Sequence, residues 1–288
     1  MTAGSGPRAI LRTAREAIRS RPVTFLLIVA LGGALDVLLH MAVGDLMPRP
    51  PEFGALVNRF GFAPVVMAWI AMAFVGMGLT FLFWARRMGG SGLAKGLRYG
   101  LAIGVMIQVA MFEGVGLLGT PVIAELVMGL ADAVPIFLMI LLLGWWLAPH
   151  SPPAAPAAVS AGLWALLPFA LIYGGGRLLA QLLGIIESGL DDGPVATILW
   201  SFAMGAVIGL AWMMLADLRR GFPGVGGALA FGLGVYGVNW ALFMTFVPMV
   251  FPDALADTAL RVGIDILLVT GAALLAGSRE AAARQADG

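Results

Sequence analysis

Residues 122–148 read VIAELVMGLADAVPIFLMILLLGWWLA, a stretch in which Glu125 and Asp132 are the only charged side chains. As an α-helix this stretch would be about 40 Å long, which exceeds the ~30 Å hydrocarbon core of a lipid bilayer. A helix that is apolar on nearly every side must be surrounded by other protein or by lipid. The stretch therefore predicts a transmembrane helix.

Similar stretches recur along the whole chain. Of its 288 residues, 60% are hydrophobic and 11% are charged, whereas soluble domains usually carry about 25% charged residues. A transmembrane β-barrel would alternate apolar and polar residues, and this pattern is absent from the sequence. We therefore predict an all-α polytopic membrane protein with eight transmembrane helices, at residues 23–45, 62–85, 99–119, 122–148, 159–185, 194–216, 225–251 and 258–277.

Basic residues are divided unequally between the two predicted sides of the membrane. Thirteen Arg and Lys residues lie on the side of the termini, against three on the opposite side and one, Arg177, within a span. An excess of basic residues in short loops marks the cytoplasmic side. We therefore expect both termini in the cytoplasm and the protein in a bacterial inner membrane. A basic segment, 1–21, would precede the first span, and a short tail, 279–288, would follow the last.

The two halves of the chain match when one is shifted along the other by a nearly constant offset. The matched pairs are Arg87 with Arg219, Tyr99 with Phe231, Gly100 with Gly232, and Asp132 with Asp265. The first helices of the two halves match only in outline. Asp36 and His40 are spaced i, i+4 in one of them, and Arg177 and Gln181 have the same spacing in the other. Four helices per half give both halves the same orientation, related by an axis along the membrane normal. We predict two tandem four-helix repeats, 22–148 and 159–278, joined by a Pro/Ala-rich linker, 149–158.

A glycine-spaced third helix precedes a fourth helix with one acid in an apolar run. The glycines are Gly96, Gly100 and Gly104, and the acid lies in Gly129–Asp132 and again in Gly263–Asp265. This arrangement resembles small uncharacterised bacterial four-helix membrane proteins over about half of the chain. The resemblance implies two such units fused in tandem and implies nothing about activity. The first helices, with Asp36 in one and Arg177 in the other, depart from a simple duplicate.

Polar residues inside the predicted helices are the best guide to function. A charge at the bilayer centre costs about 2.5–3.5 kcal/mol on insertion scales, so it persists where it is paired or useful. Counted along the helices, five charged residues share a depth between the midplane and the outer surface, and two polar residues lie one turn further out. The five are Asp36, Glu113, Asp132, Arg177 and Asp265, and the two are His40 and Gln181.

These seven residues predict a polar cavity in the outer half of the bilayer, lined by the first, fourth, fifth and eighth helices. Its only guanidinium, Arg177, would pair with Asp36, Asp132 or Asp265, because its planar fork fits a carboxylate. The cavity would bind a polar ligand or exchange a proton with the outside. Alternatively, the charges only neutralise one another and fix the register of the helices.

Other chemistry has less support in the sequence. Asp36 and His40 have the spacing of metal ligands on a helix, but the second histidine, His150, falls in a predicted cytoplasmic loop. We therefore predict no metal site and no cofactor. An aspartyl protease would need two adjacent carboxylates, and the sequence does not show which aspartates are neighbours. Nucleic-acid binding has no support beyond the short basic segment.

Three classes of function remain open. A small-solute or proton-coupled transporter fits tandem repeats with charged residues near the midplane. A non-catalytic membrane subunit or assembly partner fits the short loops and the absence of enzymatic motifs in the sequence. An intramembrane enzyme is the third class. The expected partners are the lipid bilayer and either another membrane protein or a second copy of the chain.

Overall fold

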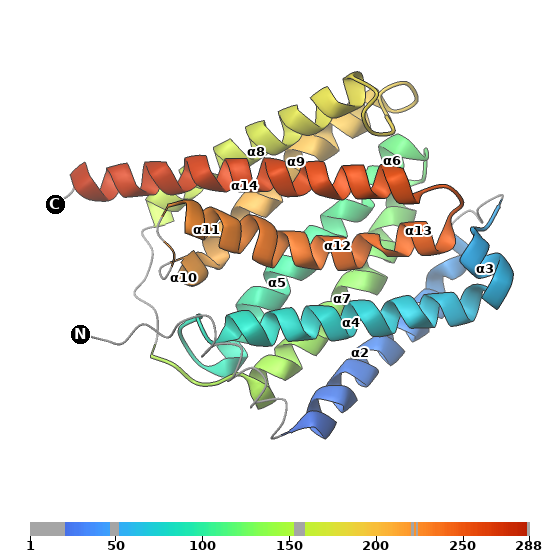
Figure 1. The fold of residues 1–288 in the computed structure, drawn as a ribbon, viewed down its shortest axis with the longest axis horizontal. Coiled ribbons are helices and arrows are strands. Elements are labelled where there is room, and N and C mark those ends of the chain that lie inside the picture. Colours follow the sequence, from blue (N-terminus) through green and yellow to red (C-terminus); the bar gives the residue numbers. More distant parts are fainter. Residues whose placement is uncertain (1–20, 47–51, 153–158, 220–221, 223, 287–288) are drawn as a thin grey trace.

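The protein is described by a computed structural model, which covers residues 21–46, 52–152, 159–219, 222 and 224–286. Figure 1 shows the helices packed side by side in one bundle, with α3 and α13 together at one end. In chain order the elements are α2 (Pro22–Val43), η1 (Gly44–Leu46), α3 (Ala55–Phe60), α4 (Phe62–Ala85), α5 (Gly92–Met111), α6 (Glu113–Leu117), α7 (Val122–Leu147), α8 (Val159–Leu182), α9 (Pro194–Met214), α10 (Ala216–Arg219), α11 (Val225–Leu229), the π-helical η2 (Ala230–Gly237), α12 (Val238–Met244), α13 (Phe246–Val250) and α14 (Leu255–Ala286). We call the end with α3 and α13 the distal end.

Seven helical segments are long and apolar enough to cross a membrane. They are Pro22–Leu46, Phe62–Ala85, Gly92–Leu117, Val122–Leu147, Pro194–Met214, Val225–Val250 and Leu255–Arg279. In α8, the part Leu166–Leu182 is a shorter apolar helix. The all-helical prediction is thus confirmed, and seven of the eight predicted spans have the required length and composition.

Two predicted boundaries differ from the structure by more than three residues. The third span starts at Gly92 rather than residue 99, because the Ser91 hydroxyl accepts a hydrogen bond from the Ala94 amide (3.2 Å) and caps the helix. Lys95, which precedes the predicted span 99–119, is therefore buried in α5, where its Nζ donates to the Pro149 carbonyl (2.6 Å). At the other end of the chain, α14 continues through most of the predicted tail. The predicted segment before Arg21 and linker residues 153–158 lie outside the described residues.

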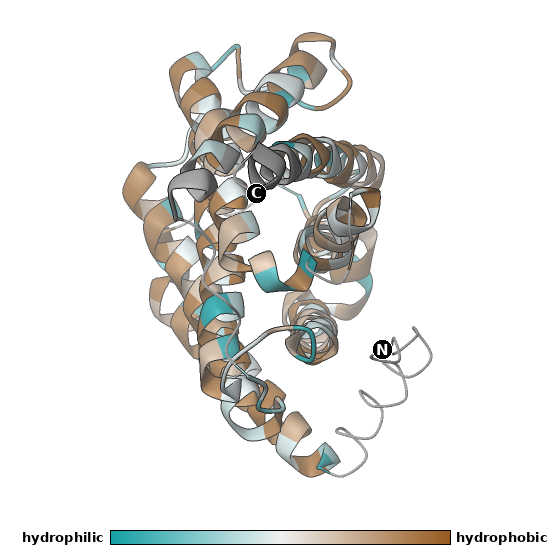
Figure 2. Ribbon diagram, turned by 90° about the vertical axis from the view of Figure 1, so that its left-hand side faces the viewer, coloured by the Kyte–Doolittle hydropathy of each residue, from teal (hydrophilic) through white to brown (hydrophobic). Residues whose placement is uncertain are grey.

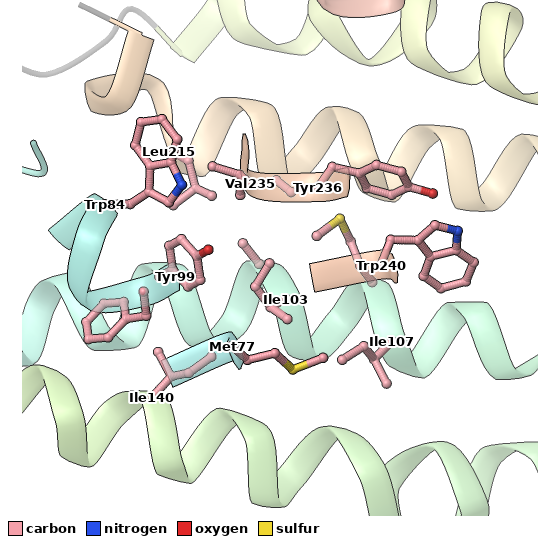
Figure 3. Packing of buried hydrophobic residues seen from close by; sticks show 14 of the residues in the cluster. Met77, Trp84, Tyr99, Ile103, Ile107, Ile140, Leu215, Val235, Tyr236 and Trp240 are labelled. Atoms are coloured by element: carbon pink, nitrogen blue, oxygen red, sulfur yellow. The ribbon is translucent and has the colours of Figure 1, made fainter. Parts of the chain in front are cut away.

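The core is a continuous layer of aromatic, aliphatic and methionine side chains between the helices. Figure 3 shows Met77 of α4, Ile103 of α5, Ile140 of α7 and Val235 of η2 facing one another across this layer, and all four are fully buried. Large apolar residues also cover the outside of the bundle, where hydrophobic residues predominate along the helices in Figure 2. An apolar exterior of this extent suits lipid rather than water.

Two indole hydrogen bonds are formed in the same way in the two halves of the chain. Trp69 of α4 donates its Nε1 to the Leu242 carbonyl of α12 at 3.2 Å. Trp200 of α9 donates its Nε1 to the Val109 carbonyl of α5 at 2.8 Å. The step along the chain from Trp69 to Trp200 is nearly the same as the step from Val109 to Leu242. These spacings agree with the offset on which the expected repeat is based.

Several helix contacts in the first half of the chain also have a counterpart in the second half. α2 packs on α7 as α8 packs on α14, and α5 packs on α9 as α12 packs on α4. Gly100 of α5 lies against Phe137 of α7, and Gly232 of η2 lies against Thr270 of α14. The step along the chain from Gly100 to Gly232 is almost the same as the step from Phe137 to Thr270. These close approaches depend on the missing Cβ, because an added Cβ would lie 3.0 Å from Phe137 and clash with Thr270.

Candidate functional site

The structure divides the seven predicted site residues between two places. Asp36, His40 and Asp132 come together on α2 and α7, and we call them the α2–α7 group. Glu113 of α6, Arg177 of α8 and Asp265 of α14 meet elsewhere, and Gln181 lines a cavity one turn along α8. The single cavity that we predicted is therefore replaced by two polar regions. The two regions are separate because α5 and α9 pack between the α2–α7 pair and the α8–α14 pair.

Arg177 is fully buried and binds two carboxylates. Its Nη1 donates to both oxygens of Asp265 at 2.6 Å, and its Nη2 donates to Glu113 Oε1 at 2.5 Å. The Asp265 side chain is also completely buried, and its Oδ2 accepts a hydrogen bond from Trp240 Nε1 at 2.9 Å. The Trp200 ring lies 5.1 Å from the guanidinium carbon. Of the three aspartates that we had offered as partners of Arg177, the structure selects Asp265.

Arg261 extends this network toward the distal end. Its Nη1 donates to the same Glu113 oxygen at 2.5 Å, and its Nε donates to Asp257 Oδ2 at 3.0 Å. The Arg261 side chain is 4% exposed and that of Asp257 is 36% exposed. We call the resulting series of residues, from the surface inward, the charge chain: Asp257, Arg261, Glu113, Arg177 and Asp265.

The charge chain holds three carboxylates and two guanidiniums. Glu113 is shared by both arginines, so one negative charge has no positive charge of its own. The three residues of α14, which are Asp257, Arg261 and Asp265, follow at intervals of four and lie on one helix face. They span about 12 Å along the helix axis, which brings Asp265 roughly to the middle of the membrane span.

A cavity of about 530 Å³ lies beside the exposed end of the charge chain. Its walls come from the end of α8, the turn before α9 and the start of α14, and they include Gln181, Glu187, Asp191 and Asp257. Gln181 is 5% exposed, and its Oε1 has no hydrogen-bond partner in the described part of the chain. Asp257 Oδ1 accepts a hydrogen bond from the Glu187 amide (3.0 Å), which fixes one wall.

The α2–α7 group is smaller and has no guanidinium among its members. His40 Nδ1 lies 2.9 Å from the Asp36 carbonyl oxygen and 3.5 Å from Asp36 Oδ2. His40 Nε2 lies 3.6 Å from Asp132 Oδ1. Asp36 and Asp132 are buried, at 1% and 4% exposure, whereas the His40 side chain is 30% exposed. The imidazole is thus the accessible member of the group.

Sequence reasoning missed Arg261, Asp257 and Trp240. Arg261 is one of the three basic residues that we counted on the side opposite the termini. Its spacing of four residues from both Asp257 and Asp265 was the available signal, since it places the three side chains in one row. No comparable signal identifies Trp240, which reaches Asp265 from another helix.

No family model, curated protein or solved structure matches the chain. The resemblance to bacterial four-helix membrane proteins therefore stays an expectation.

Proposed function

We propose that the protein is a proton-coupled transporter of a small polar solute in a bacterial inner membrane. The observation that supports this most is the charge chain, which leads from a cavity to the fully buried Asp265 and in which Glu113 shares each of its two arginines with another carboxylate. An ionised carboxylate without a counter-charge is very costly in a low-dielectric interior, so it takes up a proton or another cation. Arginine does not give up its proton, so the two guanidiniums would set the proton affinity of Glu113 rather than relay the proton.

The cavity is the proposed entry site for the solute. Its volume of about 530 Å³ is within the range of small-molecule sites, which is about 300–1,000 Å³. The acids at its wall, Glu187, Asp191 and Asp257, favour a neutral or cationic solute over an anion. A solute that binds Asp257 would compete with Arg261, and Arg261 also contacts Glu113. Solute binding would in this way change the affinity of Glu113 for a proton.

The proposed membrane arrangement has eight spans with both termini in the cytoplasm. α8 supplies the eighth span, because its 24 residues extend about 36 Å. The matched hydrogen bonds of Trp69 and Trp200 support two tandem repeats. In that arrangement Glu113 belongs to the first repeat, while both of its arginines belong to the second. The charge chain would then lie between the repeats, which is where secondary transporters bind their substrates.

Proton flux through purified protein in liposomes tests the proposal. A K⁺ diffusion potential, negative inside, is applied in the presence of a panel of amino acids, polyamines and sugars, and a pH-sensitive dye reports the interior. We expect acidification by the wild type with at least one compound, and a loss of about tenfold or more in Glu113→Gln. Glu125→Gln is the matched control, because Glu125 is also a buried acid but accepts its hydrogen bond from Thr120 outside the charge chain. Wild-type flux no greater than that of empty liposomes with every compound would reject transport.

A role as a membrane subunit is the second candidate. It is favoured by the dense bonding of Arg177, which a purely structural contact would also show. A subunit of this kind would be recovered from mild detergent with a stoichiometric partner. It would also show no proton flux in liposomes.

A further inference from the structure

We propose that Asp36, His40 and Asp132 bind a divalent transition-metal ion. The three side chains come from the distal part of α2 and from α7, and each offers one ligand atom, all within 4.8 Å of one another. The site does not depend on the transport function, because it shares no residue with the charge chain or the cavity. Sequence reasoning had excluded a metal because it found no second histidine within the membrane. The third ligand, Asp132, is brought in by the packing of α2 on α7.

The hydrogen bond of His40 leaves its other ring nitrogen available to a metal. A backbone carbonyl can only accept, so the contact of 2.9 Å between Nδ1 and the Asp36 carbonyl makes Nδ1 the protonated nitrogen. In the neutral imidazole, Nε2 then presents a lone pair toward the Asp132 carboxylate. Metal-binding histidines commonly donate their second ring nitrogen to a carbonyl in this way.

The separation between His40 and Asp132 fits two ligands of a shared ion better than a hydrogen bond between them. His40 Nε2 and Asp132 Oδ1 are 3.6 Å apart, which is too long for a good hydrogen bond. Two ligand atoms that each lie about 2.1 Å from a tetrahedral ion are roughly 3.4 Å apart. The observed separation therefore needs only a few tenths of an ångström of adjustment.

Charge and burial also call for a cation. Asp36 and Asp132 are both buried, and Asp36 Oδ1 has no hydrogen-bond partner in the described part of the chain. Two carboxylates beside one imidazole carry more negative than positive charge in either state of the ring. The exposed side of His40 leaves room for water ligands and for entry of the ion.

The second half of the chain offers a comparison for the position of Asp36. Arg177 lies as far after Asp36 along the chain as Leu166 lies after Phe25. Phe25 and Leu166 both pack against a glycine of the following long helix, which is α4 for Phe25 and α9 for Leu166. Arg177 on α8 therefore corresponds to Asp36 on α2.

This correspondence shows how a carboxylate at this position can be neutralised by a side chain of the protein itself. Asp132 and Asp265 are matched acids on α7 and α14, the last helix of each half. In the second half, the Arg177 guanidinium neutralises Asp265. In the first half, Asp36 replaces the guanidinium and adds a second carboxylate beside Asp132. Beyond the one charge that His40 can carry, the described residues offer no positive charge to this group, so we infer that it comes from a bound cation.

The ligand set selects the class of metal. Imidazole nitrogen favours transition metals, whereas Mg²⁺ and Ca²⁺ prefer oxygen ligands only. One nitrogen and two carboxylates suit Mn²⁺ or Zn²⁺, with water completing the coordination. We therefore expect both ions to bind more tightly than Mg²⁺ or Ca²⁺.

Electron paramagnetic resonance with Mn²⁺ tests the site directly. Purified full-length protein in detergent is stripped with a chelator and titrated with Mn²⁺, and pulsed measurements detect a nitrogen coupled to the bound ion. We expect one Mn²⁺ per chain with imidazole coupling, displaced by an equivalent of Zn²⁺ but not by a tenfold excess of Mg²⁺. Absence of stoichiometric binding, or bound Mn²⁺ without nitrogen coupling, would overturn the proposal.

Three variants identify the ligands. His40→Ala should abolish the nitrogen coupling, and both His40→Ala and Asp132→Asn should weaken binding by about 100-fold or more. Glu125→Gln, two turns before Asp132 on the same helix, should leave both the affinity and the coupling unchanged. Unchanged binding by His40→Ala would contradict the assignment, and His40 is exposed enough that its replacement is compatible with folding. Proton flux in liposomes is measured on the same variants, so failure of the metal site and failure of transport are distinguished.

Discussion

Replacement of Arg177 by Met tests whether the buried charges act as one network. The substitution keeps an unbranched apolar stem but shortens the side chain and removes the guanidinium. Among the described residues, Trp240 would be the remaining hydrogen-bond donor to the completely buried Asp265, whereas Glu113 would still be bound by Arg261. Stranding a buried carboxylate in this way costs about 3–5 kcal/mol of folding stability. We therefore expect a loss of this size in Arg177→Met.

The second substitution separates Asp265 from Glu113. In the double variant Arg177→Met/Asp265→Asn the stranded charge is gone, so most of the lost stability should return, with a coupling of roughly 2–3 kcal/mol between the two sites. Arg177→Met combined with Glu113→Gln should show a smaller coupling, because Glu113 has a second arginine. Unfolding in mixed micelles by addition of sodium dodecyl sulfate measures these free energies, and the eight tryptophans of the chain give the fluorescence signal.

A partly exposed ion pair provides the control. Arg98 Nη1 donates to Asp217 Oδ2 at 2.8 Å, and the Arg98 side chain is 31% exposed while that of Asp217 is 7% exposed. Asp217 also accepts a hydrogen bond from the Gly89 amide, so Arg98→Met should cost less than Arg177→Met. A neutral Arg177→Met, or a double variant whose loss equals the sum of its singles, would show that Arg177 and Asp265 do not interact energetically. The charge chain would then not exist as a unit.

Three further predictions concern packing, the repeat and topology. Gly92→Ala brings a Cβ into clash with a backbone carbonyl of α7 and should cost about 1–3 kcal/mol in the same unfolding assay, whereas Gly175→Ala, with nothing within 4 Å, should not destabilise the protein. Trp69→Phe and Trp200→Phe should each lose about 0.5–1.5 kcal/mol, and strongly unequal losses would count against the repeat. Cysteines introduced into this cysteine-free chain near positions 55, 190 and 255 should react from outside the cell with an impermeant thiol reagent, while those near 92, 153 and 222 should not. Labelling of position 153 in intact cells would refute eight spans.

The fold was predictable because a bilayer constrains single helices. Length and hydropathy are properties of each segment alone, so the spans could be located without knowing their neighbours. The predicted start of α5 was wrong because it depends on contacts with residues that are distant in sequence. Lys95 and Arg98 look like loop residues, but the Pro149 carbonyl and the Asp217 carboxylate, both distant in sequence, bind their charged groups.

The depth of the charged residues in the membrane could be predicted from the sequence, but not which of them contact one another. Counting along each helix placed Asp36, Asp132, Arg177 and Asp265 at similar levels, because depth follows from position in the span. Which of them meet depends on which helices pack together, and α2 pairs with α7 while α8 pairs with α14. Only the matched spacing of Asp132 and Asp265 hinted at this, since it places one acid on the last helix of each half.

The α2–α7 group shows where buried charge is out of balance. A structural ion pair needs one guanidinium for each carboxylate, as Arg177 supplies for Asp265. The inner part of the charge chain is balanced, because Glu113 and Asp265 are matched by two buried arginines, while its third acid, Asp257, is 36% exposed. The α2–α7 group instead carries two buried acids with one imidazole, in a region where unpaired charge is costly. A purely structural pairing would gain nothing from this deficit, whereas the proposed metal site requires it.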